Sequence, residues 1–284
     1  MAQPSELTQI AQAICGNKGL SFIAKVGEGA FKETFHVKDD QGGSLALKVY
    51  KSNTHQERND REIQAMRTCN HPGVARLFSL ETFVVGQTTY FSTTEEYLAG
   101  GPLTDKLKNQ GLMSAPAIIS LGAHLIDAIA HIASHDFVHR DLKPDNIMFR
   151  EDGQTAVVVD FGIVRQLNAE SLTGTWAMRG PGSPYYAAPE QLNNDKELID
   201  WRTDQFSLGI VLAFCAFGQH PFEAGNQVLT VEHVAQHGRP SADFLRDIQA
   251  AGLPALEKMV APWPYERYRT PQELAAAWSS QAAR

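Results

Sequence analysis

The chain has 284 residues, of which 43% are hydrophobic and 20% charged, and its formal net charge is −7. This length allows one large domain or two lobes with cores of their own. The net negative charge argues against a general nucleic-acid-binding protein, because contact with a phosphate backbone needs a basic surface. Three scattered cysteines, Cys15, Cys69 and Cys215, form no C-x-x-C pair, which fits a reducing cytoplasm better than a disulfide scaffold or a zinc site.

Residues 1–20 are interpreted as an extension ahead of the main fold. They lack the basic start and the continuous apolar stretch of a signal peptide. Leu7, Ile10 and Ile14 recur at helical spacing, which predicts a short amphipathic helix. Its apolar stripe is interpreted as a packing surface, with partner binding as the alternative.

Residues 21–97 carry mainly strand signals. Apolar residues alternate over Thr34–Val37 and again over Leu45–Tyr50, and the turn-rich stretch Asp39–Gly43 separates the two runs. Residues 55–67 are polar with one apolar side, which predicts a helix that interrupts the strands.

Helical periodicity dominates beyond about residue 100. Isoleucines and leucines from 118 to 132 form a long apolar face, and Leu208–Phe217 is an apolar run of ten residues. Because a membrane span needs about 20 residues, that run predicts a buried helix, and we expect no membrane span. Asn146–Asp160 predicts a short hairpin with a turn at Glu151–Gly153.

Together these elements predict an α+β protein with two lobes. A small antiparallel β-rich lobe would occupy residues 21–98, and a larger, mainly helical lobe would occupy residues 99–284. The Gly- and Pro-rich segment Tyr97–Pro102 is the expected hinge. Ligands favour clefts between lobes, so we expect the functional site there.

The strongest chemical signal is the segment HRDLKPDN, His139–Asn146, which follows the predicted long helix. The triplet Asp160-Phe161-Gly162 follows the apolar run Val157–Val159, while Lys48 stands in a predicted strand and Glu62 in the predicted helix. In this order these segments resemble the eukaryotic-type (Hanks-type) protein kinase family. Further matching segments are Gly27 and Gly29, LALK at 45–48, EYLAGG from Glu96, a degenerate GSPYYAAPE at 182–190, DQFSLG from Asp204, and Arg267.

The resemblance assigns catalytic roles to residues of the larger lobe. Phosphoryl transfer depends on positioning and on electrostatic stabilisation of an anionic transition state. Asp141 would accept or orient the proton of the substrate hydroxyl, and Lys143 would steady the γ-phosphate. Asn146 and Asp160 would supply oxygen ligands for Mg²⁺, or for Mn²⁺ in its place, which bridges the phosphates of ATP.

The resemblance also places the nucleotide on the small lobe. Lys48 would hold the α- and β-phosphates and be fixed by an ion pair with Glu62. The alternative partner, Glu57, lies well round the predicted helix from Glu62, and Glu62 is nearer the apolar side. The implied nucleotide-binding set is Val26, Gly27, Glu28, Gly29, Ala30, Lys32, Thr34, Ala46, Lys48, Glu96 and Leu98.

Two positions depart from the family pattern. Lys32 stands where the third glycine of the loop is usual, and it would either contact the phosphates as a second cation or point to solvent. The residues that follow alternate as a strand, so the loop lies in a hairpin and does not precede the helix of a dinucleotide fingerprint. Glu95 falls at the position that controls the pocket behind the adenine, where an unpaired buried carboxylate would be costly. It either pairs with a neighbour or marks a one-residue slip with Thr94.

Lys143 and the GSPYY sequence resemble the serine/threonine branch of the family. Arg140, directly before the catalytic aspartate, resembles kinases that are switched by phosphorylation of the activation segment, here Asp160–Glu190. The candidate autophosphorylation sites in that segment are Thr173, Thr175 and Ser171.

The resemblance therefore implies a serine/threonine protein kinase that transfers the γ-phosphate of ATP to protein hydroxyls. The expected partners are ATP and protein substrates, with no nucleic acid, and a homodimer is one arrangement for autophosphorylation in trans. We expect a cytoplasmic protein, and the brevity and style of the activation segment lean to a bacterial source. The alternatives are a pseudokinase that binds nucleotide without transfer, and a small-molecule phosphotransferase, against which the AAPE-like segment and Arg267 argue.

Other residues of the larger lobe are interpreted as structural. His139 would pack the catalytic loop, Asp204 would hold the loop backbone from below, and Glu190 would form a buried ion pair with Arg267.

Two histidine pairs stand four residues apart, His131 with His135 and His233 with His237. Neither pair has an acidic third ligand in an obvious place, so we expect no metal site at either.

Overall fold

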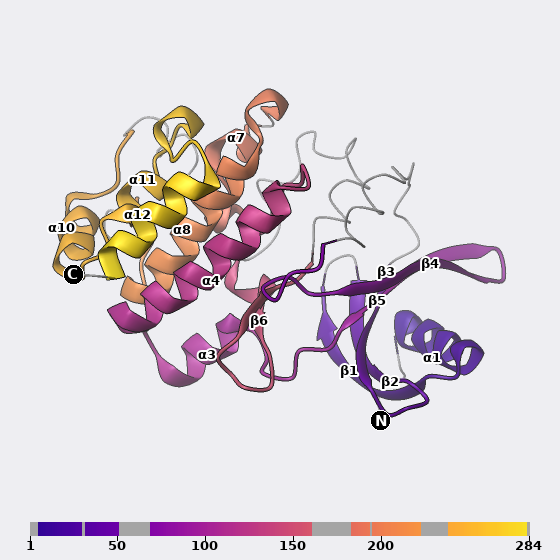
Figure 1. The fold of residues 1–284 in the computed structure, drawn as a ribbon. Helices are drawn as coiled ribbons and strands as arrows, with labels where there is room; N and C mark the ends of the chain where they lie inside the picture. Colours follow the sequence, from indigo (N-terminus) through magenta and orange to yellow (C-terminus); the bar gives the residue numbers. More distant parts are fainter. Residues whose placement is uncertain are drawn as a thin grey trace. The chain divides into compact units, whose positions relative to one another are not determined.

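The computed structural model describes residues 5–29, 32–50, 69–160, 183–193, 195–222 and 238–282. These fall into two compact units (Figure 1). The N-terminal unit takes the described residues among Met1–Asn70 and Ala75–Ala99, and the C-terminal unit takes His71–Val74 and the described residues from Gly100 onward.

An antiparallel sheet of five strands forms the N-terminal unit. Its strands are β1 (Ser21–Glu28), β2 (Lys32–Lys38), β3 (Ser44–Tyr50), β4 (Leu77–Val85) and β5 (Thr88–Glu96), in the spatial order β1-β2-β3-β5-β4. The predicted alternation over 34–37 and 45–50 is confirmed, and the Asp39 carboxylate accepts the backbone N–H groups of Gln41 and Gly43 in the turn between them. The helix predicted at 55–67 lies outside the described residues.

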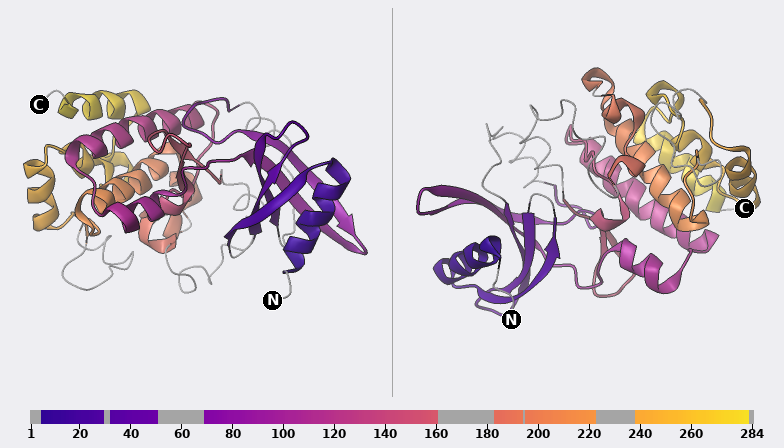
Figure 2. Two further views of the ribbon diagram at one scale, coloured as in Figure 1. Left: turned by 90° about the horizontal axis from the view of Figure 1, so that it is seen from below. Right: turned by 180° about the vertical axis from the view of Figure 1, so that it is seen from behind.

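Helix α1 (Glu6–Lys18) covers one face of this sheet (Figures 1 and 2). The Ser5 side chain accepts the N–H of Thr8 and caps the helix start, and Gly19 ends it at a φ of 68°, a left-handed conformation that suits glycine. The predicted amphipathic packing helix is therefore confirmed. Its buried residues Leu7, Ile10, Ala11, Ile14 and Cys15 share one core with Phe35, Val37, Leu47, Val49 and Tyr90 of the strands.

The alternation of side chains along the strands determines which residues lie on the opposite face of the sheet. Successive side chains of a strand point to opposite faces, so Ala46 and Lys48 lie on the face away from Leu47 and Val49. Antiparallel pairing then sets Glu95 beside Ala46 and Thr93 beside Lys48 on that face. We call this the open face of the sheet, meaning only the face that α1 does not cover.

The C-terminal unit is mainly helical, which together with the sheet of the other unit confirms the predicted α+β class. Its described helices are α3 (Leu103–Gln110), α4 (Ala115–Ala133), α6 (Ser183–Tyr186), α7 (Pro189–Leu192), α8 (Trp201–Phe217), α10 (Ala242–Ala250), α11 (Ala255–Met259) and α12 (Pro271–Ala282), with short 3₁₀ turns at Pro144–Asn146, Lys196–Leu198 and Pro264–Glu266.

Helix α4 is the centre of the helical packing and lies alongside α8 and α12 (Figure 2). The indole N–H of Trp278 donates to the carbonyl of Ile119, and a Cβ at Gly122 would lie 2.2 Å from the Trp278 ring, so only glycine allows this approach. Within the described ranges, α4 alone is long and apolar enough to cross a membrane by length and composition. Its buried apolar side chains pack against α8 and α12, as expected for a core helix.

The predicted hairpin is confirmed as β6 (Ile147–Phe149) paired with β7 (Ala156–Val158). It is reached from the predicted hinge through Gly100, whose N–H donates to the carbonyl of Phe149. A Cβ at Gly100 would lie 2.2 Å from the carbonyl oxygen of Arg150. The chain needs glycine here because the β6 backbone comes this close.

Candidate active site

The HRDLKPDN loop lies between α4 and β6 in the C-terminal unit and is held by a buried carboxylate. Asp204, in the first turn of α8, accepts the backbone N–H groups of His139 at 2.7 Å and Arg140 at 2.8 Å. Arg140 has a φ of 63°, a left-handed conformation that is costly for a residue with a Cβ. The two hydrogen bonds hold the loop in this turn, which confirms the interpretation of Asp204.

The buried ring of His139 connects the loop to the strand before Asp160. Its Nδ1 accepts the backbone N–H of Asp141 at 3.2 Å, so the proton is assigned to Nε2, which donates to the carbonyl of Val159 at 2.8 Å. Both nitrogens of this neutral ring are thereby used for backbone contacts. The structural interpretation of His139 is confirmed.

Three polar side chains of the loop form one cluster. Lys143 Nζ lies 3.0 Å from Asp141 Oδ2, and the amide of Asn146 donates to the same oxygen at 3.0 Å and to the Asp141 carbonyl at 2.8 Å. Asp141 and Lys143 are partly exposed, whereas Asn146 is buried. A carboxylate oriented by a cation and an amide, and still reachable from solvent, can accept a proton from a hydroxyl group.

Asp160 lies near this cluster because the residue before it is hydrogen-bonded to the loop. The N–H of Val159 donates to the carbonyl of Asn146 at 2.9 Å, which fixes the residue before Asp160 against the loop. Asp160 itself has a φ of 62°, and such strained backbone is frequent at functional sites. The Asp160 carboxylate and the Asn146 amide oxygen are the hard ligands that could hold Mg²⁺.

A buried ion pair braces the same unit, as predicted. Arg267 and Glu190 form two hydrogen bonds, from Nη1 to Oε1 at 2.7 Å and from Nη2 to Oε2 at 3.0 Å. Thr203 also donates to Glu190, and Arg267 donates to the carbonyls of Ala261 and Pro262. Burial lowers the pKa of Arg267, although the bonds to Glu190 oppose this.

The glycine loop of the N-terminal unit lies in the β1–β2 hairpin, as expected. Gly27 pairs with Thr34 across the two strands, and the N–H of Gly29 donates to the carbonyl of Lys32 at 2.8 Å. A Cβ at Gly27 would meet Thr34 at an ordinary 3.5 Å. The protein's own packing therefore does not demand glycine at this position, which fits a role in leaving room for a ligand.

The other predicted nucleotide residues spread over the same sheet. Thr34 pairs with Lys48, and Ala46 pairs with Glu95, so Thr34, Ala46 and Lys48 share the open face. Lys32 Nζ lies 5.8 Å from the Tyr50 ring centre. Val26 and Glu28 lie on β1, Glu96 ends β5 and Leu98 is buried just beyond it, while Ala30 is outside the described residues.

Lys48 has a carboxylate partner that the sequence did not assign. Its Nζ lies 2.5 Å from Glu95 Oε2, and Thr93 donates to Glu95 Oε1 at 2.8 Å. The partner predicted from the sequence, Glu62, is outside the described residues. Thr94 pairs with Leu47 on the α1 side of the sheet, so the side chain beside Ala46 belongs to Glu95, and Glu95 pairs with a neighbour.

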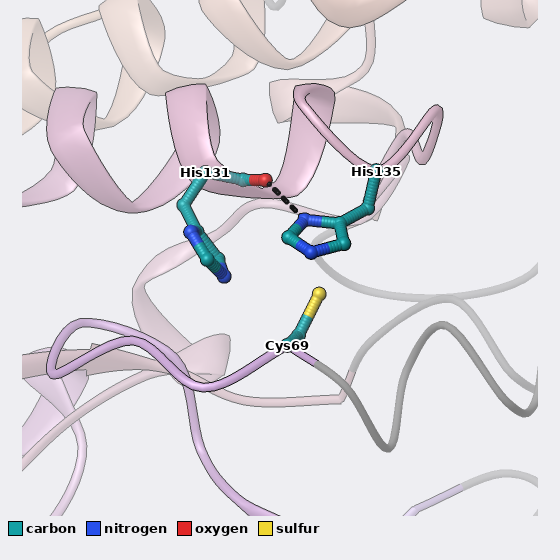
Figure 3. Close-up of side chains that lie close together, drawn as sticks. All are labelled: Cys69, His131 and His135. Atoms are coloured by element: carbon teal, nitrogen blue, oxygen red, sulfur yellow. Dashed lines mark hydrogen bonds between the residues drawn. The ribbon is translucent and has the colours of Figure 1, made fainter.

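The first predicted histidine pair lies at the C-terminal end of α4 (Figure 3). His135 Nδ1 donates to the carbonyl of His131 at 2.9 Å, and the two ring centres are 4.6 Å apart. The His71 ring stacks on His131 at 4.8 Å and pairs with Asp127. Burial, with smaller effects of His71 and His135, lowers the pKa of His131. The absence of a metal site at this pair stays a prediction, and the second pair is outside the described residues.

Comparison with known proteins shows the family to which the chain belongs. Residues 20–279 match the protein kinase domain family. The match covers more than half of the chain, which therefore belongs to this family.

The relatives include bacterial and plant enzymes. A "probable serine/threonine-protein kinase" of Clostridium perfringens is 28% identical over 92% of this chain and 38% of its own length. The serine/threonine-protein kinase AfsK of Streptomyces coelicolor is 27% identical over 92% and 34%, and CBL-interacting protein kinase 32 of Oryza sativa is 29% identical over 89% and 57%. This chain thus spans between 34% and 57% of these curated relatives.

A solved structure shares the fold. The crystal structure of Rad53 1-466 in complex with AMP-PNP superposes with a TM-score of 0.70 at 24% identity, over 95% of this chain and 69% of that one.

Proposed function

We propose that this chain is a serine/threonine protein kinase, which transfers the γ-phosphate of ATP to serine and threonine hydroxyls of proteins. The observation that carries the proposal is the Asp141 carboxylate held by Lys143 and Asn146 in a member of the protein kinase domain family. The serine/threonine kinases of Clostridium and Streptomyces among the relatives support the same branch.

In the proposed reaction the substrate hydroxyl oxygen bonds to the γ-phosphorus of ATP while the bond from that phosphorus to the bridging oxygen of ADP breaks. Asp141 orients the hydroxyl and takes its proton, and Lys143 balances negative charge on the transferred group. Proton transfer of this kind contributes about 10²–10⁴-fold to a rate.

The nucleotide would bind on the open face of the N-terminal sheet. Thr34 and Ala46 would lie against the adenine, and Lys48 would contact the phosphates below the glycine loop. Asn146 and Asp160 would hold Mg²⁺, or Mn²⁺, which neutralises phosphate charge when bound. The Rad53 neighbour was crystallised with AMP-PNP, an ATP analogue, which supports this assignment.

Autophosphorylation of the activation segment is part of the proposal. The candidate residues Thr173, Thr175 and Ser171 are outside the described residues, and a phosphate there would pair with Arg140. A homodimer that phosphorylates in trans would carry out this step. A cytoplasmic location is proposed separately, and the free cysteines of the chain support it.

One assay tests the function. Wild type, Asp141→Asn and Lys48→Met are incubated with radiolabelled MgATP and a generic protein substrate, followed by phosphoamino-acid analysis. We expect phosphoserine or phosphothreonine with the wild type and background label with both variants. A thermal shift with MgATP but no transfer by the wild type would instead identify a pseudokinase.

A further inference from the structure

The ion pair of Lys48 and Glu95 is built into the strand register of β3 and β5. Glu95 pairs with Ala46 and Thr93 pairs with Lys48, so Glu95 is the diagonal neighbour of Lys48 on the open face. Diagonal neighbours in a sheet are within reach of long side chains. The Lys48 ammonium reaches the Glu95 carboxylate along this diagonal at 2.5 Å.

Both charges are buried and satisfied. Lys48 is 6% exposed and Glu95 is 7% exposed. One carboxylate oxygen of Glu95 accepts from Lys48 and the other accepts from Thr93, which is fully buried. A carboxylate in such a place is tolerated only with partners, and here the partners fix its orientation.

We propose that Glu95 is a positioning residue for Lys48: it holds the ammonium group at a set place on the open face, where the nucleotide phosphates bind. The inference rests on the proposed function and gives Glu95 a role toward Lys48 that the kinase resemblance did not assign. An ammonium group has three N–H donors, so Lys48 can donate to Glu95 and to phosphate oxygens together. Glu95 lies on a strand that is hydrogen-bonded to β3, so the sheet itself sets the geometry of the pair.

The kinetic test compares wild type with Glu95→Gln and Glu95→Asp. Gln keeps the size but removes the charge, and Asp keeps the charge but shortens the reach. Since misplacement by about 1 Å can cost up to 10²-fold, we expect Gln to raise the KM for ATP and to lower kcat/KM by about tenfold or more, with partial recovery in Asp. Glu81→Gln is the matched control, because it removes a partly exposed pair with Lys18 elsewhere in the same sheet.

The stability test is independent of catalysis. Lys48→Met leaves the buried Glu95 carboxylate without its cation, so we expect its Tm to fall by several degrees and the double variant Lys48→Met/Glu95→Gln to recover most of that loss. In the Lys48→Met background, Glu95→Gln should cause no further loss of affinity for MANT-ATP with Mg²⁺, because its effect passes through the lysine.

The experiments distinguish a failure of the proposed role of Glu95 from a failure of the proposed kinase function. Glu95→Gln with wild-type KM and kcat, or a double variant that is less stable than Lys48→Met alone, would overturn the positioning role. If the wild type transfers no phosphate, the proposed function fails, and the MANT-ATP and Tm measurements still decide the role of Glu95.

Discussion

Asp204 follows His139 by 65 residues in the chain, yet its carboxylate accepts the backbone N–H of His139 at 2.7 Å. The second oxygen accepts the N–H of Arg140. One side chain at the start of α8 therefore sets the backbone of the loop that carries Asp141.

Replacement of Asp204 should reduce catalysis more than it reduces folding. Asp204→Asn places an amide NH₂ against one of two N–H donors, so the loop loses one bond and shifts. A small shift of the loop would displace Asp141, and we expect kcat to fall by about 10²-fold. Steady-state kinetics with MgATP measures this. The control is Asp200→Asn at the cap of the same helix. Asparagine caps about as well as aspartate, so this variant should leave both kcat, within about twofold, and stability nearly unchanged. Equal kcat losses in both variants would contradict the prediction.

The Arg267–Glu190 pair should govern stability. Arg267→Met leaves the Glu190 carboxylate buried without its cation, and removal of one partner from a buried pair costs about 3–5 kcal/mol. We expect the midpoint of urea unfolding to fall sharply. The exposed Arg246–Asp243 pair is the control, since Arg246→Met removes an ion pair open to solvent and should leave the midpoint unchanged. Similar midpoints for the two variants would show that Arg267 is not the brace.

Substitution by alanine should lower the free energy of unfolding at Gly100 and raise it at Gly16. At Gly100 a Cβ would lie 2.2 Å from the Arg150 carbonyl oxygen, so Gly100→Ala must displace the β6 backbone and should cost about 1–3 kcal/mol of unfolding free energy. Gly16 lies within α1, and a Cβ there meets nothing within 4 Å. Gly16→Ala should stabilise the protein by about 0.5–1 kcal/mol, because glycine is a poor helix former. Urea unfolding of both variants tests these two predictions. A lower free energy of unfolding in Gly16→Ala would contradict the packing described for α1.

The sequence identified the candidate catalytic loop, with roles implied by the kinase resemblance, because its polar residues stand close together in the chain. Asp141, Lys143 and Asn146 lie within six consecutive residues, and one tight turn brings them together. Helix α1 (Glu6–Lys18) was equally readable, since its apolar spacing needs no knowledge of a partner. The Glu190–Arg267 pair was assigned only through the kinase resemblance.

The partner of Lys48 could not be predicted with the same means. It depends on the register of β3 against β5, which joins residues 47 positions apart. The available signal was the acidic Glu95 in a strand otherwise rich in threonine, at even spacing from Thr93 and therefore on the same face. The stack of His71 on His131 depends likewise on a contact between distant segments, for which the sequence carries no spacing rule.

Stability should decline in acid partly through His220. This buried ring donates from Nε2 to the carbonyl of Tyr185 and accepts the N–H of Phe222 at Nδ1. Burial, opposed by the bond to Tyr185, lowers the pKa of His220 to about 4 from 6.5. Because the pKa is lower in the folded state, the neutral ring is favoured there and its contribution is complete above about pH 6.5. The contribution is lost as the pH falls toward 4, by about 3 kcal/mol in total.

The measurement is the free energy of urea unfolding between pH 4 and 8 for wild type and His220→Gln. Protonation at Nδ1 would break the bond from Phe222, and glutamine cannot titrate, so we expect a smaller acid loss in the variant even though it starts less stable. His124→Gln, at an exposed position on α4, should keep the wild-type pH profile. An acid loss of wild-type size in His220→Gln would assign the pH dependence to other groups. Glu33 could account only for a loss at the acid end of this pH range. Burial raises the pKa of Glu33, but hydrogen bonds from Lys25 and Ser5 outweigh this and lower it. Its contribution is therefore lost only at lower pH than that of His220, which separates the two effects along the pH axis.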